Sequence, residues 1–183
     1  LDQLLESVQL TASSYGLQPY EVIVVENPEI REKLKAEAWN QTQITEASHL
    51  VIFANLTKVT ENYVNTYLNN IAATRDMSRE DLKGMEDMIK NTTLQLPQEK
   101  QNLWAAKQAY IALGNLLAAA AHMKIDACPM EGFNAGKFDE ILQLENKDLT
   151  TAVIAPIGYR SAEDQYQHLA KVRKSTSDLI HFI

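Results

Sequence analysis

Two short stretches of the sequence carry side chains in patterns that suit chemistry. In the first, ACPMEGF at residues 127–133, the acid Glu131 stands between Met130 and Gly132 after a short apolar approach. A turn after a buried strand needs no carboxylate there, because Asn, Asp or Ser forms such a turn more readily. Glu131 therefore either serves a bound molecule or is a solvated turn acid, and the motif taken alone favours the solvated acid.

The second stretch, LAKVRKS at residues 169–175, places Lys171 and Arg173 two positions apart. In an extended segment this spacing sends both side chains to the same side. An ammonium and a guanidinium group together suit a single phosphate. The cluster is a local exception in a chain of net charge −7, although a solvated charge run near the C-terminus is the more common reason for such a pattern.

Several familiar catalytic patterns are absent. The sequence contains no GxSxG, HExxH, GxxxxGK or GxGxxG motif, which disfavours the common hydrolase, zinc-protease and nucleotide-loop functions. Its four histidines lie far apart without an i, i+4 spacing and give little support to a metal site. The single cysteine, Cys128, excludes an internal disulfide, suits a small core residue better than a nucleophile, and fits a reducing cytoplasm.

Composition limits the class of protein. The chain has 183 residues, 45% of them hydrophobic and 22% charged, so we expect one globular domain over residues 1–183. A net charge of −7 without a broad basic patch argues against nucleic-acid and anionic-membrane partners. The longest apolar run, 109–121, is shorter than the ~20 residues of a membrane span and indicates a buried helix. Leu1 is not a methionine and opens inside a helical pattern, so we expect further chain before it.

Hydrophobic periodicity predicts the elements that must position these residues. Strands are expected at residues 20–25, 49–56, 125–129 and 150–159, and helices at 1–12, 28–39, 98–122 and 136–144, with polar helices over 60–100 that break near 76–78. Asn27 and Pro28 suit the N-cap and the first position of their helix. Three strands are nearly continuous apolar runs, which is typical of a sheet covered by helices on both faces. The helix at 98–122 is apolar on almost every side, and a subunit interface would cover it.

Four stretches together resemble the nitroreductase family of FMN-dependent NAD(P)H oxidoreductases, namely SSYGLQPYEVIVV, WNQTQITEASHLVIFA, ACPMEGF and LAKVRKS. Their order and spacing cover nearly the whole chain, from the first helix to the basic tail. The resemblance implies an α+β, three-layer αβα fold with a central mixed sheet flanked by helices and a long buried helix at the dimer interface. It also implies an obligate homodimer with two FMN sites between the subunits.

The resemblance gives the acidic turn a role. In such proteins the turn that corresponds to Pro129, Met130 and Glu131 lies along one face of the isoalloxazine ring. The residue that corresponds to Glu131 offers its backbone N–H to flavin N5, and the glycine that corresponds to Gly132 lets the chain approach the ring closely. This implies a functional reason for an acid in that position.

Further FMN contacts follow from the same resemblance. Lys171 and Arg173 correspond to the pair that binds the phosphate. Ser13 and Ser14 correspond to positions that contact the FMN of the partner subunit near its phosphate and ribityl chain, although a serine pair at a helix end is often only a cap. Gly16 lies in the same loop, at a position where many members carry Asn.

The flavin pyrimidine is expected to meet two amide side chains. Asn40 corresponds to a residue that hydrogen-bonds the pyrimidine. At Gln43 many members carry Lys, so this chain lacks a positive charge where reduced flavin gathers negative charge, and we expect a lower reduction potential than in those members. The basic Arg-x-Ser segment that precedes the first long helix in the family does not occur in these residues. We therefore expect weak FMN binding or an incomplete site from these residues alone.

The resemblance thus predicts an enzyme that takes hydride from NADH or NADPH onto FMN and passes it, by a ping-pong mechanism, to a small planar acceptor such as a nitroaromatic or a quinone. The lack of a GxGxxG motif agrees with a nicotinamide that uses the acceptor's own cleft. Two alternatives stay open: a flavin enzyme of another reaction type, such as an enone reductase or a reductive dehalogenase, and a non-catalytic FMN-binding protein. The residues that select the acceptor are expected within 60–100.

Overall fold

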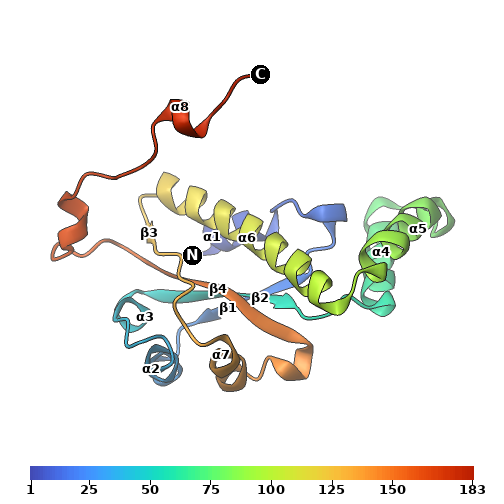
Figure 1. Cartoon of the computed structure of the whole chain (residues 1–183). Helices are drawn as coiled ribbons and strands as arrows, with labels where there is room; N and C mark the ends of the chain where they lie inside the picture. Colours follow the sequence, from blue (N-terminus) through green and yellow to red (C-terminus); the bar gives the residue numbers. More distant parts are fainter.

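The computed structural model describes residues 1–183 and is organised around one four-stranded sheet (Figure 1). The strands are β1 (Tyr20–Val25), β2 (His49–Leu56), β3 (Asp126–Ala127) and β4 (Leu149–Gly158), and they lie in the order β1-β2-β4-β3. β1 and β2 have the predicted bounds, and β3 is shorter than predicted. Every neighbouring pair is antiparallel, so the prediction of a mixed sheet is wrong. Nearly continuous apolar strands indicate that both faces of a sheet are covered, and they do not determine strand direction.

Different helices cover the two faces of the sheet (Figure 1). One face carries α1 (Asp2–Gln9) and α6 (Gln98–His122), and the other carries α2 (Pro28–Ala36), α3 (Gln43–Glu46) and α7 (Ala135–Leu142). Along β2, Val51 and Phe53 pack in the layer of α1 and α6. Leu50 and Ile52, which point the opposite way, pack in the layer of α2 and α7. The predicted three-layer αβα arrangement of the α+β class is therefore confirmed.

The start of α2 shows how local sequence sets a helix boundary. The side-chain Oδ1 of Asn27 accepts hydrogen bonds from the N–H groups of Glu29 and Ile30 at 2.9 and 3.0 Å. These bonds satisfy two backbone donors that the first turn of a helix leaves without partners. Pro28 occupies the first helical position, where its missing N–H has no cost. Both predicted roles are confirmed.

Residues 60–95 form a separate helical lobe. α4 (Glu61–Arg75) ends at Asp76, whose φ of 51° is left-handed, and α5 (Lys83–Thr92) follows a short connection. The break that the sequence predicts near 76–78 is therefore present. The apolar side chains of the two helices pack with Leu17 and Val59 in a distinct core cluster, and Figure 1 shows the lobe beside the N-terminal end of α6.

The longest helix, α6, is buried on one side only. Inward positions such as Ala105, Ala112 and Leu116 are fully buried. On the outer side, Leu103 is 58% exposed and Ile111 is 48% exposed. A single chain thus buries one side of the helix, because one face of a sheet covers only one side of a helix, and the burial of its other side in a subunit interface stays a prediction. An apolar outer face is left on the surface.

Two buried amides connect α6 to neighbouring loops. Gln101 accepts a hydrogen bond from the N–H of Val59 at 2.9 Å and donates one to the carbonyl of Leu96 at 2.9 Å. Gln108 accepts a hydrogen bond from the N–H of Ser14 at 2.8 Å. These neutral side chains satisfy backbone groups that have no partner within a helix or strand. The position of α6 therefore helps to set the position of all three connecting segments.

A buried carboxylate ties α7 to β4. Asp139 is 7% exposed and accepts three hydrogen bonds of 2.7 Å, from the N–H and hydroxyl of Thr151 and from the hydroxyl of Thr150. A hydrogen bond to a charged group contributes roughly 1.5–3 kcal/mol. This cluster therefore holds α7, which follows directly after residues 128–133, firmly against the sheet.

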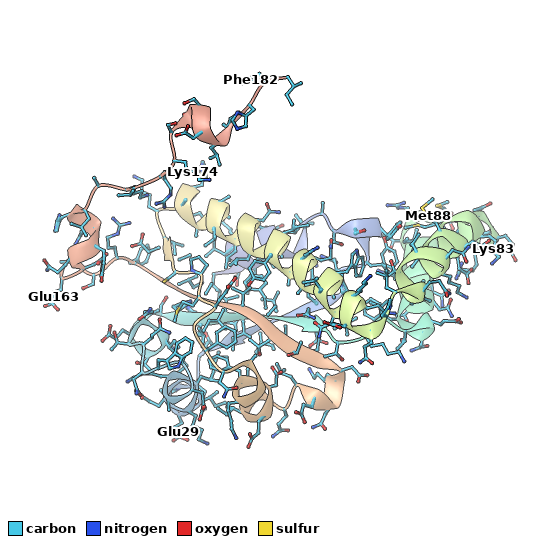
Figure 2. All side chains as sticks on the ribbon, viewed as in Figure 1. Glu29, Lys83, Met88, Glu163, Lys174 and Phe182 are labelled. Atoms are coloured by element: carbon cyan, nitrogen blue, oxygen red, sulfur yellow. The ribbon has the colours of Figure 1, made fainter.

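Beyond β4 the chain extends away from the layers. Arg160 binds Asp126 of β3 through two hydrogen bonds of 2.6 and 2.7 Å. After it the chain forms a short helix, α8 (Thr176–Leu179), which the sequence did not predict because four residues are too few to show a helical period. Figures 1 and 2 show α8 and the labelled Phe182 standing clear of the layers, and Phe182 is 95% exposed. None of the helices combines the length and apolar character that crossing a membrane requires.

Candidate functional site

The segment at residues 128–133, here called the Glu131 turn, is anchored to the sheet at one residue. Met130 is buried and exchanges backbone hydrogen bonds of 2.8 and 3.2 Å with Ile154 of β4. Pro129 and Glu131, on either side of it, are exposed. This is the alternation of an extended chain, in which successive side chains point in opposite directions. The sheet therefore fixes the turn while its neighbouring residues face outward.

Two adjacent backbone N–H groups of the Glu131 turn have no hydrogen-bond partner. The N–H groups of Glu131 and Gly132 donate no bond, whereas the N–H of Phe133 donates to the carbonyl of Glu131 at 3.0 Å. Backbone donors in folded chains are almost always paired, with protein groups or with solvent. Two free donors side by side on a fixed turn can bind an acceptor atom of a ligand.

Gly132 lies close to two side chains of another loop. A Cβ atom at this position would lie 2.5 Å from Cζ3 of Trp39 and 3.2 Å from Nε2 of Gln41. The same Nε2 donates a hydrogen bond of 2.8 Å to the carbonyl of Gly132. A side chain at position 132 would therefore have to displace the ends of Trp39 and Gln41, which lie in the connection between α2 and α3.

That connection, here called the Trp39 loop (residues 38–43), has an uncommon backbone. Trp39 and Asn40 have φ values of 51° and 57°, and Trp39 is 70% exposed. Cys128 is exposed rather than a core residue; partial desolvation raises the pKa of its thiol, and the nearby Gln43 side chain partly offsets the rise. The structure thus brings the Trp39 loop, which contains the predicted Asn40 and Gln43, against the predicted turn.

The carboxylate of Glu131 is held from the opposite layer of the fold. Tyr110 of α6 donates its hydroxyl to Oε1 of Glu131 at 2.5 Å. Burial raises the pKa of Tyr110 to about 12, together with the hydrogen bond and the negative charge of Glu131. The phenol therefore stays protonated at neutral pH and acts as a hydrogen-bond donor.

The segment at residues 13–18, here called the serine loop, has three residues in left-handed conformations. The φ values of Tyr15, Gly16 and Gln18 are 57°, 75° and 44°. This conformation is ordinary for glycine and rare for the other two residues. A Cβ atom on Gly16 would also collide with the hydroxyl of Tyr67 on α4.

Two tyrosines of α4 hold the serine loop. The hydroxyl of Tyr63 lies 2.7 Å from the carbonyl oxygen of Gln18 and 3.0 Å from that of Leu17. The hydroxyl of Tyr67 donates to the carbonyl of Tyr15 at 2.6 Å. A cavity of about 390 Å³ opens between this loop and α4. The helical lobe therefore supports the left-handed backbone of the loop.

The two predicted serines take part in contacts within their own chain. The Oγ of Ser13 accepts a hydrogen bond from the N–H of Gln18 at 3.0 Å. The N–H of Ser14 is bound to Gln108 of α6, and its hydroxyl forms no hydrogen bond. No hydrogen bond joins either serine to the Glu131 turn.

The predicted phosphate pair lies in the extended tail. Lys171 and Arg173 are exposed, and neither forms a hydrogen bond or ion pair with the Glu131 turn or the serine loop. Lys171 lies close enough to Asp126 to contribute to lowering the pKa of that carboxyl, an effect that is mainly due to Arg160. Within one chain, the structure therefore groups the Trp39 loop with the Glu131 turn and leaves the other predicted residues apart.

Three side chains that contact the Glu131 turn were not predicted as site residues: Trp39, Gln41 and Tyr110. Trp39 precedes the predicted Asn40, and an aromatic residue in a polar stretch at a helix end was an available signal. Tyr110 is one of only two polar side chains in the apolar run at 109–121. Gln41 carries no comparable signal, because an isolated amide in a loop is common.

Sequence comparison relates the chain to known proteins. The sequence profile of the nitroreductase family matches residues 1–159. YfkO of Bacillus subtilis (strain 168), which bears the provisional name NAD(P)H nitroreductase, is 35% identical over 192 aligned residues. The alignment covers 98% of this chain and 85% of YfkO.

Solved structures share the fold. The crystal structure of ydfN from Bacillus subtilis, provisionally named a nitroreductase, superposes with a TM-score of 0.87 at 18% identity and covers 100% of this chain and 86% of that chain. A provisionally named nitroreductase from Exiguobacterium sibiricum 255-15, solved in complex with FMN, has a TM-score of 0.80 at 20% identity and covers 100% of this chain and 85% of that chain. At 18% and 20% sequence identity, these similarities establish only that the chains share a fold.

We expect Gly16→Ala to lower the free energy of unfolding by roughly 1–3 kcal/mol, because alanine must adopt a φ of 75° and its Cβ meets the hydroxyl of Tyr67. The matched control is Gly84→Ala on α5, where the added Cβ has open space and better helix propensity adds up to about 1 kcal/mol. Denaturant unfolding measures both changes. Equal stabilities of the two variants would contradict the left-handed backbone described for the serine loop.

Proposed function

Because the chain belongs to the nitroreductase family, we propose that this oxidoreductase transfers hydride from NADH or NADPH, by way of bound FMN, to a small planar acceptor such as a nitroaromatic or a quinone. FMN supplies the chemistry at its N5 atom, and the protein supplies binding, orientation and electrostatics. The observation that carries the proposal is the pair of free N–H groups at Glu131 and Gly132.

The residues around the Glu131 turn fit a flavin. The free N–H groups suit the N5 acceptor, and Gly132 removes the side chain that would otherwise separate the backbone from the ring. Asn40 and Gln43 bring amide groups to the same region, and an amide can both donate and accept, as the edge of a pyrimidine ring requires. These groups would hold the flavin ring, while the relative from Exiguobacterium was itself solved with FMN.

Trp39 covers Gly132 in the structure and is 70% exposed. A flat ring bound against the Glu131 turn must therefore displace this indole or stack beside it. Either movement changes the surroundings of the Trp39 side chain. Its fluorescence is expected to report binding.

The proposed reaction needs no dedicated acid or base from the protein. An acceptor reduced in an open cleft can take its proton from solvent. The nicotinamide and the acceptor use the same cleft in turn, in agreement with the absence of a GxGxxG nucleotide motif. The side chains around the turn therefore bind and orient, and Gln43 contributes a neutral donor in place of a cation.

We expect NAD(P)H oxidation to follow ping-pong kinetics, with parallel double-reciprocal lines as the acceptor is varied, since both substrates use one cleft in succession. Steady-state measurements on the purified FMN-loaded protein test this. Intersecting lines would indicate a ternary complex and contradict the shared cleft.

Assays with nitroaromatic, quinone, enone and halogenated acceptors, run side by side, separate the proposed reaction from the alternatives. Bound FMN that no acceptor reoxidises would favour a non-catalytic FMN-binding protein.

Two copies of the chain are proposed to build the complete site. Ser13 and the tail residues are not joined to the Glu131 turn within one chain, so a second copy is needed to bring such groups together. The outer face of α6, with Leu103 and Ile111 exposed, offers an apolar surface of the kind that interfaces cover. This interpretation also explains why α6 is half covered in a single chain.

We expect the protein to sediment as a dimer at low micromolar concentration, and Ile111→Glu to shift it toward the monomer, because the change places a charge on the outer face of α6. Met88→Glu is the matched control: Met88 is 55% exposed on α5, at the outer edge of the helical lobe in Figure 2, and its replacement should leave the dimer intact. A wild-type monomer would contradict the interface and the shared site.

The basic tail is proposed to bind the FMN phosphate. We expect Lys171→Ala combined with Arg173→Ala to weaken FMN binding by roughly two to four powers of ten, because two charge-assisted contacts of ~1.5–3 kcal/mol each are removed. Riboflavin, which lacks the phosphate, should bind equally well to the variant and the parent. Gly132→Val should exclude both ligands, since its side chain enters the space beside the ring. Fluorescence titration of FMN and riboflavin into the flavin-free parent and the two variants measures these affinities.

Lys174→Ala is the control for the tail variant, because it removes a cation from the same run that is not assigned to the phosphate. It should retain most of the affinity for FMN. If the double variant binds FMN as tightly as the parent, Lys171 and Arg173 are a solvated charge run and the phosphate assignment is wrong.

A further inference from the structure

The Glu131 turn is held by side chains from two opposite layers of the fold. Gln41, from the Trp39 loop, donates to the carbonyl of Gly132 at 2.8 Å. Tyr110, from α6 on the other face of the sheet, donates to the carboxylate of Glu131 at 2.5 Å. These are the side-chain hydrogen bonds that reach the two residues with free N–H groups. The orientation of those N–H groups therefore depends on both contacts.

The contact from Tyr110 has the geometry of a strong hydrogen bond on a rigid support. A separation of 2.5 Å is at the short end of the range for a hydroxyl that donates to a carboxylate. Tyr110 stands on a helix of 25 residues, which the buried Gln101 and Gln108 connect to two loops. No ion pair involves Glu131. The phenol of Tyr110 is thus the fixed partner of this carboxylate.

The charge of Glu131 matters because of where it lies. Its carboxylate belongs to the same residue that presents one of the free N–H groups. A reduced flavin carries more negative charge than the oxidised form, so a nearby carboxylate without a donor disfavours reduction. A hydrogen bond from Tyr110 offsets part of that charge and directs the carboxylate toward α6.

We propose that Tyr110 is a positioning residue for the flavin that acts through Glu131: its hydroxyl holds the Glu131 carboxylate against α6, which orients the free N–H groups of the turn and reduces the negative charge felt by the ring. The inference rests on the proposed function, because it takes the Glu131 turn to face FMN. It adds a residue from the middle of α6 to a site otherwise built from loops.

Tyr110→Phe keeps the ring and removes only the hydroxyl. We expect the dissociation constant of FMN to rise about tenfold, as for the loss of one hydrogen bond to a charged group. The midpoint potential of bound FMN should fall by about 30 mV, which corresponds to a tenfold change in the equilibrium constant of a two-electron couple. Tyr159→Phe is the matched control, since Tyr159 is 85% exposed and its hydroxyl forms no hydrogen bond. In Tyr159→Phe, the affinity for FMN and the midpoint potential of bound FMN should equal those of the parent.

A double-mutant cycle tests whether Tyr110 acts through Glu131. In the Glu131→Ala background, Tyr110→Phe should change neither the affinity nor the potential, because the bond is already absent. Glu131→Gln keeps an acceptor for the phenol and removes the charge, so the midpoint potential should rise. Equal effects of Tyr110→Phe in both backgrounds would overturn the proposal and indicate a separate packing role.

The flavin-free protein provides a readout that does not depend on FMN. Hydrogen exchange at the amides of Met130 and Phe133, which are bonded within and beside the turn, should be faster in Tyr110→Phe than in Tyr159→Phe. Unchanged exchange together with an unchanged potential would overturn the proposal. If the parent protein binds no FMN, the proposed function fails and the flavin role of Tyr110 fails with it, whereas the exchange rates still decide whether Tyr110 holds the turn.

Discussion

The antiparallel pairing of β2 with β4 is the constraint on which the rest of the structure depends. Both strands are buried on both faces, and their register places His49 opposite Ile157 and Ile52 opposite Ile154. Because side chains alternate along a strand, this register decides which residues meet each layer of helices. Ile154 also bonds the backbone of Met130, so the register positions the Glu131 turn directly. A slip of one residue would exchange the two cores and turn Met130 away from its layer.

The candidate site lies where the three layers meet. The sheet contributes the anchor of Met130, the Trp39 loop contributes Gln41, and α6 contributes Tyr110. The next element along the chain, α7, is locked to β4 by the buried Asp139. A short exposed turn is thus fixed from every side, which explains how two backbone donors can remain without partners on an ordered segment.

The sequence was a good guide wherever burial leaves a local pattern. β1 and β2 were predictable to the residue because each is a nearly continuous run of apolar and β-branched residues, and Asn27 with Pro28 marked the start of α2. Strand direction was not predictable, since periodicity shows that a face is apolar and does not show what covers it. Contacts such as that between Tyr110 and Glu131 depend on how the chain folds back across the sheet. The resemblance, rather than any pattern, supplied the roles of Lys171 and Glu131, and those roles stay predictions.

The free donors of the Glu131 turn belong to the main chain, and this has a consequence for how such a protein can diverge. A substitution at a residue that binds through its backbone leaves the donor in place, provided that the path of the chain is kept. The binding groups then depend on the sheet register and on the space at Gly132, and most side chains nearby can change without removing them.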